Sequence, residues 1–328
     1  MYRQALLASG VTEDEIRWAR KNGTWTRLHR GSYIPSEPIS ALDKEAMHRL
    51  RAIAVAGRSP HLVLSHISAA AIHRVPLFGV QLDTVHLTRV GASGGRTGPG
   101  RVVHVAELGP DEVMTRNGVQ LTNVARTLVD FACTVPFASA VVAADHALYR
   151  EIVNPQALSD ALTKTRHRRG AAAARRALLF ADGRSESPGE SRLRLDMHRA
   201  GLEAPVLQIC VYAADGRFLG RADLGYPEQG LLMEFDGKAK YTKLRKVGQS
   251  IDEVVLAEKA REDLIRGLGY TVIRFDWNEL ANPPAAIAKI RENLERSRRM
   301  VMTGGLAGHW TAKAALQIPR GKGSARPA

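Results

Sequence analysis

Three acidic residues stand at the ends of two predicted β-strands, where acidic side chains are uncommon. Asp223 ends the strand predicted for RFLGRADLGY, and Glu234 and Asp236 end the strand predicted for GLLMEFDG. Glu234 and Asp236 are two positions apart, so we expect their side chains on one face of the sheet. Three converging carboxylates repel one another unless a hard cation neutralises them, and Mg²⁺ prefers oxygen ligands. The pattern therefore predicts a Mg²⁺ site formed by Asp223, Glu234 and Asp236.

Such an ion activates water and stabilises the negative charge that develops on a phosphate under attack. The alternative for Glu234 and Asp236 is a solvated strand end followed by a turn at Asp236-Gly237. Glu190 also has two interpretations. It is either a catalytic acid carried by a helix beside the ion, or the partner of Ser187 in a helix capping box. The sequence leaves these alternatives open.

The elements that position these acids are predicted in the order α-β-β-β-α-β, over residues 184–300. The first helix has Ser187 as its cap and Pro188 at its first position. The strand PVLQICVYA turns at Asp215-Gly216 into RFLGRADLGY, and GLLMEFDG follows as the third strand. The long helix IDEVVLAEKAREDLIRGLG then leads into the fourth strand, YTVIRFDW. This order predicts a mixed sheet whose edge carries the acids.

The stretches SPGESRLRL, RADLGYPEQGLLMEFDGKAKY and EKAREDLIRGLGYTVIRFDW resemble the PD-(D/E)XK nuclease superfamily, in the branch related to very-short-patch-repair endonucleases. The resemblance covers about a third of the chain. It implies a restriction-endonuclease-like fold and Mg²⁺-dependent cleavage of DNA. Asp223 matches the first metal-binding acid of that family, Glu234 the second, and Glu190 the helix-borne glutamate.

The sequence departs from that family at one position, because Asp236 stands where a lysine is expected two residues after the second acid. Lys238 is taken as the catalytic lysine, with Lys240 as the alternative. If neither reaches the site, the domain binds DNA without cutting it. Candidate phosphate contacts on the following helix and strand are Lys259, Arg261 and Arg274. Lys259 and Asp263 also have the spacing of an ordinary helix ion pair.

Residues 1–36 have the pattern of a small winged helix-turn-helix. A short helix over residues 3–9 ends at Gly10, and a second begins after Thr12, with Glu15 completing a capping box. Gly23 is predicted to end that helix. A hairpin follows in TWTRLHRGSYIP, closed by a turn at Arg30-Gly31.

The second helix and the wing of this segment carry five basic residues, the type that contacts phosphates and base edges. These candidate DNA contacts are Arg17, Arg20, Lys21, Arg27 and Arg30. The alternative is a solvated charged face, because Glu13, Asp14 and Glu15 dilute the positive charge. The segment GVTEDEIRWARKNGTWTRLHRGSYIP resembles the N-terminal domain of the AbiEi family of type IV antitoxins. That resemblance implies repression of its own operon, and a cognate nucleotidyltransferase toxin as partner.

Residues 37–180 are predicted to form an α/β middle domain. The stretches LSHISAAAIHRVPL, VHLTR and LTNVARTLVDFA also resemble the middle region of AbiEi-like proteins. GASGGRTGPG is predicted to be a flexible loop. Four histidines, His66, His73, His86 and His104, fit no metal-binding spacing, so we assign them to the core or surface. The stretch KTRHRRGAAAARRAL is either an exposed basic linker helix or a clamp for phosphates.

Composition supports a polyanionic partner, because 47 lysines and arginines stand against 33 aspartates and glutamates, a net charge of +14. An anionic membrane surface is the minor alternative, although no basic amphipathic helix with a Trp/Leu face supports it. Two distant cysteines, Cys133 and Cys210, form neither a disulfide framework nor a zinc site. No signal peptide or membrane-spanning stretch is evident. A cytoplasmic protein is expected.

The fold class predicted is a multidomain α/β protein, ending in a partly disordered tail over residues 301–328. The function predicted is that of a double-stranded-DNA-binding protein with a Mg²⁺-dependent endonuclease-like domain. The alternative is an AbiEi-like antitoxin and transcriptional repressor whose nuclease fold is catalytically silent. Oligomeric state and the DNA sequence recognised are not predicted.

Overall fold

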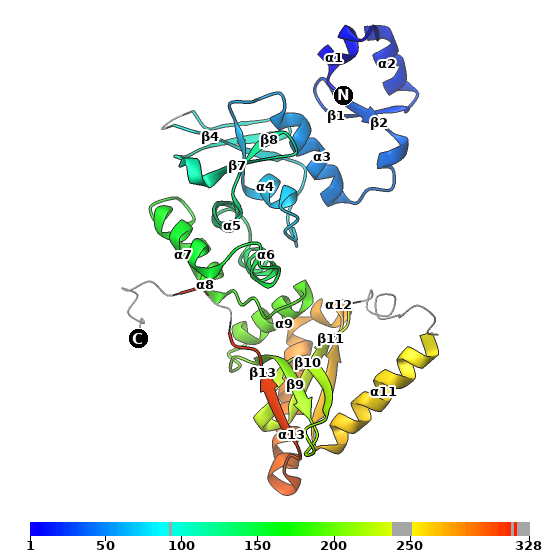
Figure 1. Cartoon of the computed structure of the whole chain (residues 1–328), viewed down its shortest axis with the longest axis vertical. Helices are drawn as coiled ribbons and strands as arrows, with labels where there is room; N and C mark the ends of the chain where they lie inside the picture. Colours follow the sequence, from blue (N-terminus) through cyan, green and yellow to red (C-terminus); the bar gives the residue numbers. More distant parts are fainter. Residues whose placement is uncertain (92–93, 238–250, 316–317, 320–328) are drawn as a thin grey trace. The chain divides into compact units, whose positions relative to one another are not determined.

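The computed structural model describes residues 1–91, 94–237, 251–315 and 318–319. The chain separates into two compact units. Residues 1–147 and 151–181 belong to the first, and residues 148–150 and 182–315 belong to the second. Helices and sheets alternate in both units, so the protein is a mixed α/β protein (Figure 1).

The first unit begins with two helices and a hairpin: α1 (Arg3–Ala8), α2 (Glu13–Lys21), β1 (Trp25–His29) and β2 (Ser32–Pro35). The capping box predicted for α2 is present, since Thr12 Oγ1 accepts from Glu15 N at 3.2 Å and the Glu15 carboxylate accepts from Thr12 N at 2.7 Å. Leu6, Ile16 and Tyr33 form the small core. The hairpin turns at Arg30-Gly31, as predicted.

The same unit continues into a six-stranded sheet with strand order β5-β6-β4-β3-β8-β7. Its elements are α3 (Lys44–Ala56), β3 (Val63–Leu64), α4 (His66–Ile72), β4 (Val85–Arg89), β5 (Arg96–Gly98), β6 (Arg101–Val105), β7 (Val113–Arg116) and β8 (Val119–Thr122). The apolar sides of α3 and α4 pack with Leu64, Leu87 and Leu121 of the sheet. The prediction of a flexible loop over residues 91–100 is wrong in part, because β5 pairs antiparallel with β6.

Four helices complete the first unit: α5 (Val124–Ala132), α6 (Phe137–Tyr149), α7 (Pro155–Lys164) and α8 (Ala171–Phe180). The alanines of KTRHRRGAAAARRAL do form a helix, α8. The basic residues 166–169 precede it, in the turn that ends at Gly170. Gly170 has a φ of 84°, a left-handed conformation that favours glycine, so the helix cannot extend back through it.

The second unit contains a five-stranded mixed sheet with strand order β12-β11-β10-β9-β13. The predicted order α-β-β-β-α-β is observed as α9 (Pro188–Arg199), β9 (Val206–Tyr212), β10 (Phe218–Tyr226), β11 (Leu231–Phe235), α11 (Ile251–Gly267) and β12 (Thr271–Phe275). Strands β11 and β12 are parallel, and the other pairs are antiparallel. Apolar cores containing Leu193 and Phe275 in one cluster, and Ile209 and Ile265 in another, pack against the sheet.

The chain after β12 is more ordered than the sequence indicates. It forms α12 (Trp277–Leu280), α13 (Pro283–Gly304) and β13 (His309–Ala312). Within the segment predicted as a partly disordered tail, β13 pairs with β9 and extends the sheet, and residues 320–328 lie outside the described residues. A short polar strand of four residues gives little periodicity, so sequence patterning misses it.

Candidate functional site

Asp223 lies where β10 and β11 stop pairing. The ladder between these strands runs from Tyr226↔Leu231 to Leu224↔Met233, while β10 continues along β9 as far as Phe218. Beyond this point Asp223 Oδ2 accepts a hydrogen bond from the backbone N–H of Phe235 at 2.7 Å. A side-chain carboxylate thus takes the place of the backbone acceptor that a continued ladder would supply.

Glu190 enters the same neighbourhood from the first turn of α9, where it is 5% exposed. Its carboxylate accepts hydrogen bonds from Ser187 Oγ at 2.7 Å and from Glu186 N at 2.9 Å. Ser187 caps α9, because its Oγ accepts from Glu190 N at 3.3 Å, but the Glu190 carboxylate bonds the backbone N–H of Glu186 where a capping box would use that of Ser187. Burial, and then the charge of Asp223, raises the pKa of this carboxyl to about 8.

Gln208 of β9 contacts the Glu190 carboxylate. Its Nε2 donates to Glu190 Oε2 at 3.1 Å, and the residue is 1% exposed with a φ of 55°. Within the described ranges its Oε1 is buried without a hydrogen-bond partner. A buried amide oxygen without a donor is costly, and such atoms call for an explanation. This residue was not singled out from the sequence, since its unusual backbone is visible only in the fold.

Glu234 and Asp236 contact arginines of α11 and β12. Glu234 Oε1 accepts from Arg261 Nη2 at 2.7 Å, and Glu234 Oε2 accepts from Arg274 Nε at 3.1 Å. Arg274 Nε also lies 3.5 Å from Asp236 Oδ2, and its Nη1 lies 2.6 Å from Glu262 Oε2. Two guanidinium groups thus neutralise the acids, so the repulsion that would demand a metal is already relieved.

In the part of the chain that the structure describes, no three His, Cys, Asp or Glu side chains gather so as to hold a metal ion. Asp223 thus contacts the backbone of Phe235, and Glu234 and Asp236 contact Arg274, while the Mg²⁺ site formed by Asp223, Glu234 and Asp236 stays a prediction. Arg261 and Arg274 contact acids, whereas Lys259 is exposed on α11. Lys238 and Lys240 lie outside the described residues.

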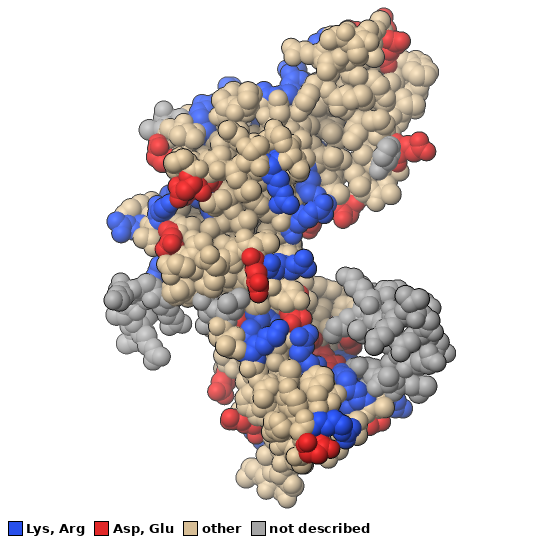
Figure 2. All heavy atoms as spheres, in the orientation of Figure 1, with Lys and Arg blue, Asp and Glu red and all other residues tan. Residues whose placement is uncertain are grey.

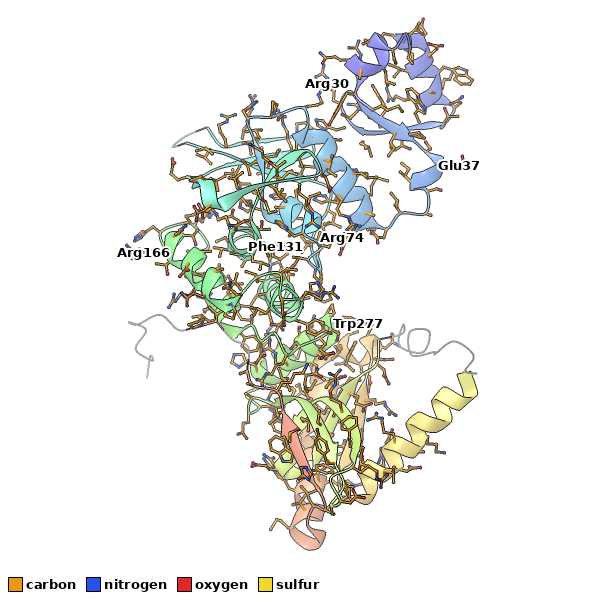
Figure 3. The ribbon with its side chains drawn as sticks, viewed as in Figure 1. Arg30, Glu37, Arg74, Phe131, Arg166 and Trp277 are labelled. Carbon is orange, nitrogen blue, oxygen red and sulfur yellow. The ribbon has the colours of Figure 1, made fainter. Side chains whose placement is uncertain are left out.

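The basic residues predicted as DNA contacts divide between α2 and the wing. Arg17, Arg20 and Lys21 are exposed on α2, and Arg17 Nη1 lies 2.7 Å from Asp14 Oδ1. Trp18 stands among them with 66% of its surface exposed, which is unusual for so large an apolar side chain. Arg27 and Arg30, on the hairpin, line a cavity together with residues of the middle region. Arg30 lies at the hairpin turn (Figure 3).

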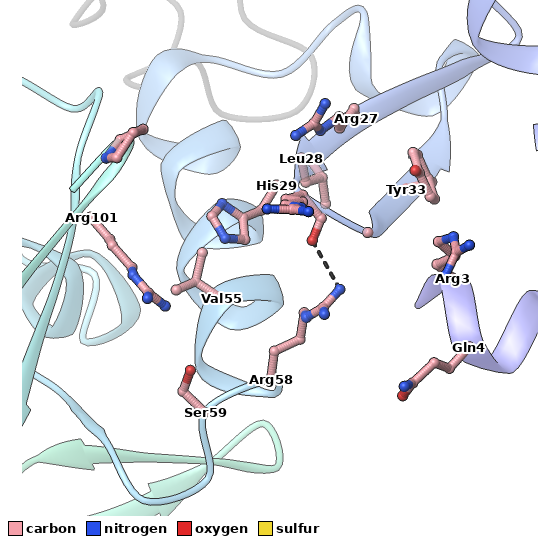
Figure 4. A pocket seen from close by; sticks show the side chains of 13 residues that line it. Arg3, Gln4, Arg27, Leu28, His29, Tyr33, Val55, Arg58, Ser59 and Arg101 are labelled. Carbon is pink, nitrogen blue, oxygen red and sulfur yellow. Dashed lines mark hydrogen bonds between the residues drawn. The ribbon is translucent and has the colours of Figure 1, made fainter. Parts of the chain in front are cut away.

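This cavity, which we name the arginine groove, has a volume of about 1090 Å³. Its five arginines are Arg3, Arg27, Arg30, Arg58 and Arg101, and no acidic residue lines it. They come from α1, β1, the hairpin turn, the residues after α3, and β6. Arg58 Nη1 donates to the carbonyl of Arg30 at 2.9 Å (Figure 4). Burial, followed by the charges of Arg101, Arg58 and Arg27, lowers the pKa of His29 in this groove.

Arg3 pairs with Glu13, but among the described residues Arg27, Arg30, Arg58 and Arg101 have no acidic partner. A second cavity of about 530 Å³ shares Ser59, Pro99 and Arg101 with the groove, and adds Arg89 and Arg96. It too has no acidic lining residue. Elsewhere on the face seen in Figure 2, basic and acidic side chains are interspersed, so net charge alone does not locate this surface.

Sequence reasoning identified Arg27 and Arg30 but missed Arg3, Arg58, Arg89, Arg96 and Arg101. Only tertiary structure brings these residues together, because they come from separate elements. One signal was available: Arg96 and Arg101 flank the Pro99-Gly100 turn in RTGPGR, the pattern of a basic hairpin tip.

Searches of known proteins found no family model that matches the chain. Two uncharacterized proteins of Mycobacterium tuberculosis, from strain CDC 1551/Oshkosh and strain H37Rv, are each 27% identical to it over 289 residues, covering 88% of this chain and 99% of the relative. The crystal structure of the RV2827C protein of M. tuberculosis matches 62% of this chain and 75% of its own, at 16% identity and a TM-score of 0.34. Over the described ranges no helix is both long and apolar enough to cross a membrane. The chain is thus similar to full-length mycobacterial proteins whose own functions are undescribed.

Proposed function

We propose that this protein binds double-stranded DNA through the arginine groove and its adjoining cavity. The observation that carries the proposal is the gathering of seven arginines around two connected cavities with no acidic lining residue. Unpaired guanidinium groups repel one another, and a phosphate backbone relieves that repulsion while releasing its condensed counterions. Guanidinium groups also match phosphate oxygens in a bidentate geometry.

Helix α2 supplies a second contact surface in this proposal. Asp14, Arg17, Trp18 and Lys21 follow the i, i+3, i+4, i+7 spacing of one helix face and are exposed. A helix that follows a short helix and precedes a hairpin occupies the place of a recognition helix in a winged helix-turn-helix. The groove would then position the duplex by its phosphates, while α2 reads base edges. A repressor resembling the AbiEi antitoxins uses this division of labour.

Fluorescence anisotropy with a labelled duplex from the upstream region of the gene tests the proposal. We expect Arg101→Ala to weaken binding and to reduce the slope of log K against log salt by about one. Arg116→Ala is the matched control, because Arg116 is exposed in the same unit, on β7 at the opposite edge of the sheet. Salt-independent binding, or equal effects of the two substitutions, would reject the groove as the DNA site.

A Mg²⁺-dependent endonuclease is the second candidate, favoured by the buried hydrogen bond between Glu190 and Gln208 and by the charge of Asp223, which acts on Glu190. The unpartnered Oε1 of Gln208 and the two carboxyls are oxygen donors of the kind that a hard cation prefers. Glu190, Asp223 and Gln208 would hold the ion, which would supply an activated water and stabilise charge on the phosphate. Arg261 and Arg274 would keep Glu234 fixed beside the site.

A plasmid-nicking assay with Mg²⁺ separates this candidate from a silent nuclease fold. We expect Asp223→Asn to remove nicking while leaving anisotropy of the duplex unchanged. Persistent nicking by Asp223→Asn would assign the activity to a contaminant, and absence of nicking by the wild-type protein would leave a DNA-binding protein alone.

A further inference from the structure

Three histidines from separate elements meet in the first unit, beside α5 and away from the residues that line the arginine groove. The rings of His66 and His104 stack with centroids 3.7 Å apart and planes 16° from parallel. His86 Nδ1 lies 2.9 Å from His104 Nε2, within hydrogen-bond distance. The histidines come from α4, β4 and β6, and they follow no metal-binding spacing in the sequence.

A short relay of hydroxyl groups leads to His66. Thr88 Oγ1 donates to Ser65 Oγ at 2.8 Å, and Ser65 Oγ lies 2.9 Å from His66 Nδ1. This arrangement leaves the Ser65 proton free to be donated to Nδ1. The neutral ring then carries its proton on Nε2, where it is a hydrogen-bond donor. His66 also has a φ of 50°, a strained conformation of the sort that clusters at functional sites.

A cavity of about 600 Å³ lies against this cluster. Its lining residues are His66, His104, Val105, Cys133, Thr134, Arg168 and Arg169. The two arginines come from the turn before α8. This turn packs so closely on the end of α5 that a Cβ at Gly170 would overlap the carbonyl of Cys133. The fully buried Asp130 holds Arg168 by an ion pair, while Arg169 is exposed. The cavity therefore has a fixed imidazole floor and a basic rim.

The chemistry of these lining residues selects one class of ligand. A cation is disfavoured because no acidic residue lines the cavity and two arginines do. Among the described side chains no group of three suited to a metal ion is found. An apolar ligand would displace water from the exposed guanidinium group of Arg169 without replacing its hydrogen bonds. An anion with several acceptor oxygens satisfies Arg168, Arg169 and His66 together.

We propose that this cavity binds the phosphate group of a small phosphate ester, with Arg168 and Arg169 donating from the rim and His66 and His104 donating from the floor. The volume falls in the range of small-molecule sites, about 300–1000 Å³, and exceeds what a bare phosphate fills. The site is separate from the arginine groove, so this proposal does not depend on DNA binding.

Titration with inorganic phosphate tests the site directly, followed through the ¹⁵N shifts of the imidazole nitrogens and by calorimetry, with chloride at matched ionic strength as the reference. We expect the signals of His66 and His104 to move, and Arg169→Ala to weaken binding by about tenfold, the loss of one charge-assisted contact. Arg166→Ala is the control, because Arg166 is exposed near the end of α7, in the same basic stretch, without lining the cavity (Figure 3). Unmoved histidine signals, or equal losses in the two variants, would overturn the proposal.

A DNA duplex distinguishes a small phosphate ester from a nucleic-acid backbone as the source of the phosphate. We expect a duplex without terminal phosphates to leave the His66 and His104 signals in place. We also expect bound inorganic phosphate to remain bound when this duplex is added. Displacement of phosphate by the duplex would make the cavity part of the DNA-binding surface, and would overturn its assignment to a small molecule.

Discussion

The carboxylate of Asp223 accepts a hydrogen bond from the backbone N–H of Phe235 at 2.7 Å, at the point where β10 and β11 cease to pair. One acid therefore supports the sheet and, at the same time, raises the pKa of Glu190 through its charge. The structural and electrostatic roles of Asp223 can be separated by choosing the substitution.

Asp223→Asn should keep the fold, because the amide oxygen can still accept from Phe235 N. Asp223→Ala leaves that N–H without its acceptor, and we expect it to lower the free energy of unfolding by about 1–3 kcal/mol. Urea denaturation of the two variants measures the difference. Equal stability of both variants would show that the hydrogen bond contributes nothing.

Arg274 is expected to be a main support of the second unit, because it contacts Glu234, Asp236 and Glu262. Arg274→Ala leaves Glu234, which is 6% exposed, with one of its two guanidinium partners. We expect a loss of about 1–3 kcal/mol in unfolding free energy, measured by urea denaturation. Arg299→Ala removes an exposed helix pair with Glu295 and should cost less than about 0.5 kcal/mol. A comparable loss in both variants would contradict the assignment.

The raised pKa of Glu190 predicts a stability that falls as pH rises. Between the ordinary carboxyl pKa of 4.5 and about 8, the folded protein keeps a proton that the unfolded chain has released. Unfolding free energy in EDTA should decrease across that window, and Glu190→Gln should flatten the decrease. A pH profile that is the same in wild type and Glu190→Gln would show that Glu190 titrates normally.

Sequence patterning predicted most of the local structure because strong local signals determined it. Thr12 with Glu15 and Ser187 with Glu190 mark helix starts that the structure contains. Strands β5 and β13 were missed, since such short strands acquire their conformation from a neighbouring strand and not from their own residues.

The candidate sites were harder to predict, because each depends on which elements become neighbours. The spacing of Glu234 and Asp236 predicted one shared face, but Arg261 and Arg274 come from a later helix and strand and neutralise both acids. The groove arginines and the three stacked histidines are likewise far apart in sequence. The sequence shows which residue types are present, whereas only the folded structure shows which of them contact one another.

The histidine cluster predicts acid sensitivity of the first unit. Burial is the main cause of the lowered pKa of His66, His86 and His104, and that of His86 falls to about 4. As pH falls below 6.5, these histidines bind protons in the unfolded chain but not in the folded protein. The free energy of unfolding should therefore decrease toward pH 4. Histidine signals in NMR spectra should remain those of neutral rings at pH 5.5, a value about one unit below the ordinary histidine pKa, and become charged in urea. Charged rings in the folded protein at that pH would contradict the burial of the cluster.

Gly189 sets how closely α9 approaches β11. A Cβ at this position would overlap the ring of Phe235, which is 3% exposed and packs edge-on against Trp277. Gly189→Ala should therefore destabilise the protein by about 1–3 kcal/mol through overpacking, despite the better helix propensity of alanine. Gly304→Ala, at the end of α13 where a Cβ meets nothing within 4 Å, is the control and should be neutral or stabilising. Glu190 adjoins Gly189, so the Gly189→Ala variant should also lose the pH dependence of the unfolding free energy that we assign to Glu190. A Gly189→Ala protein that is as stable as the wild type and keeps this pH dependence would contradict the close packing.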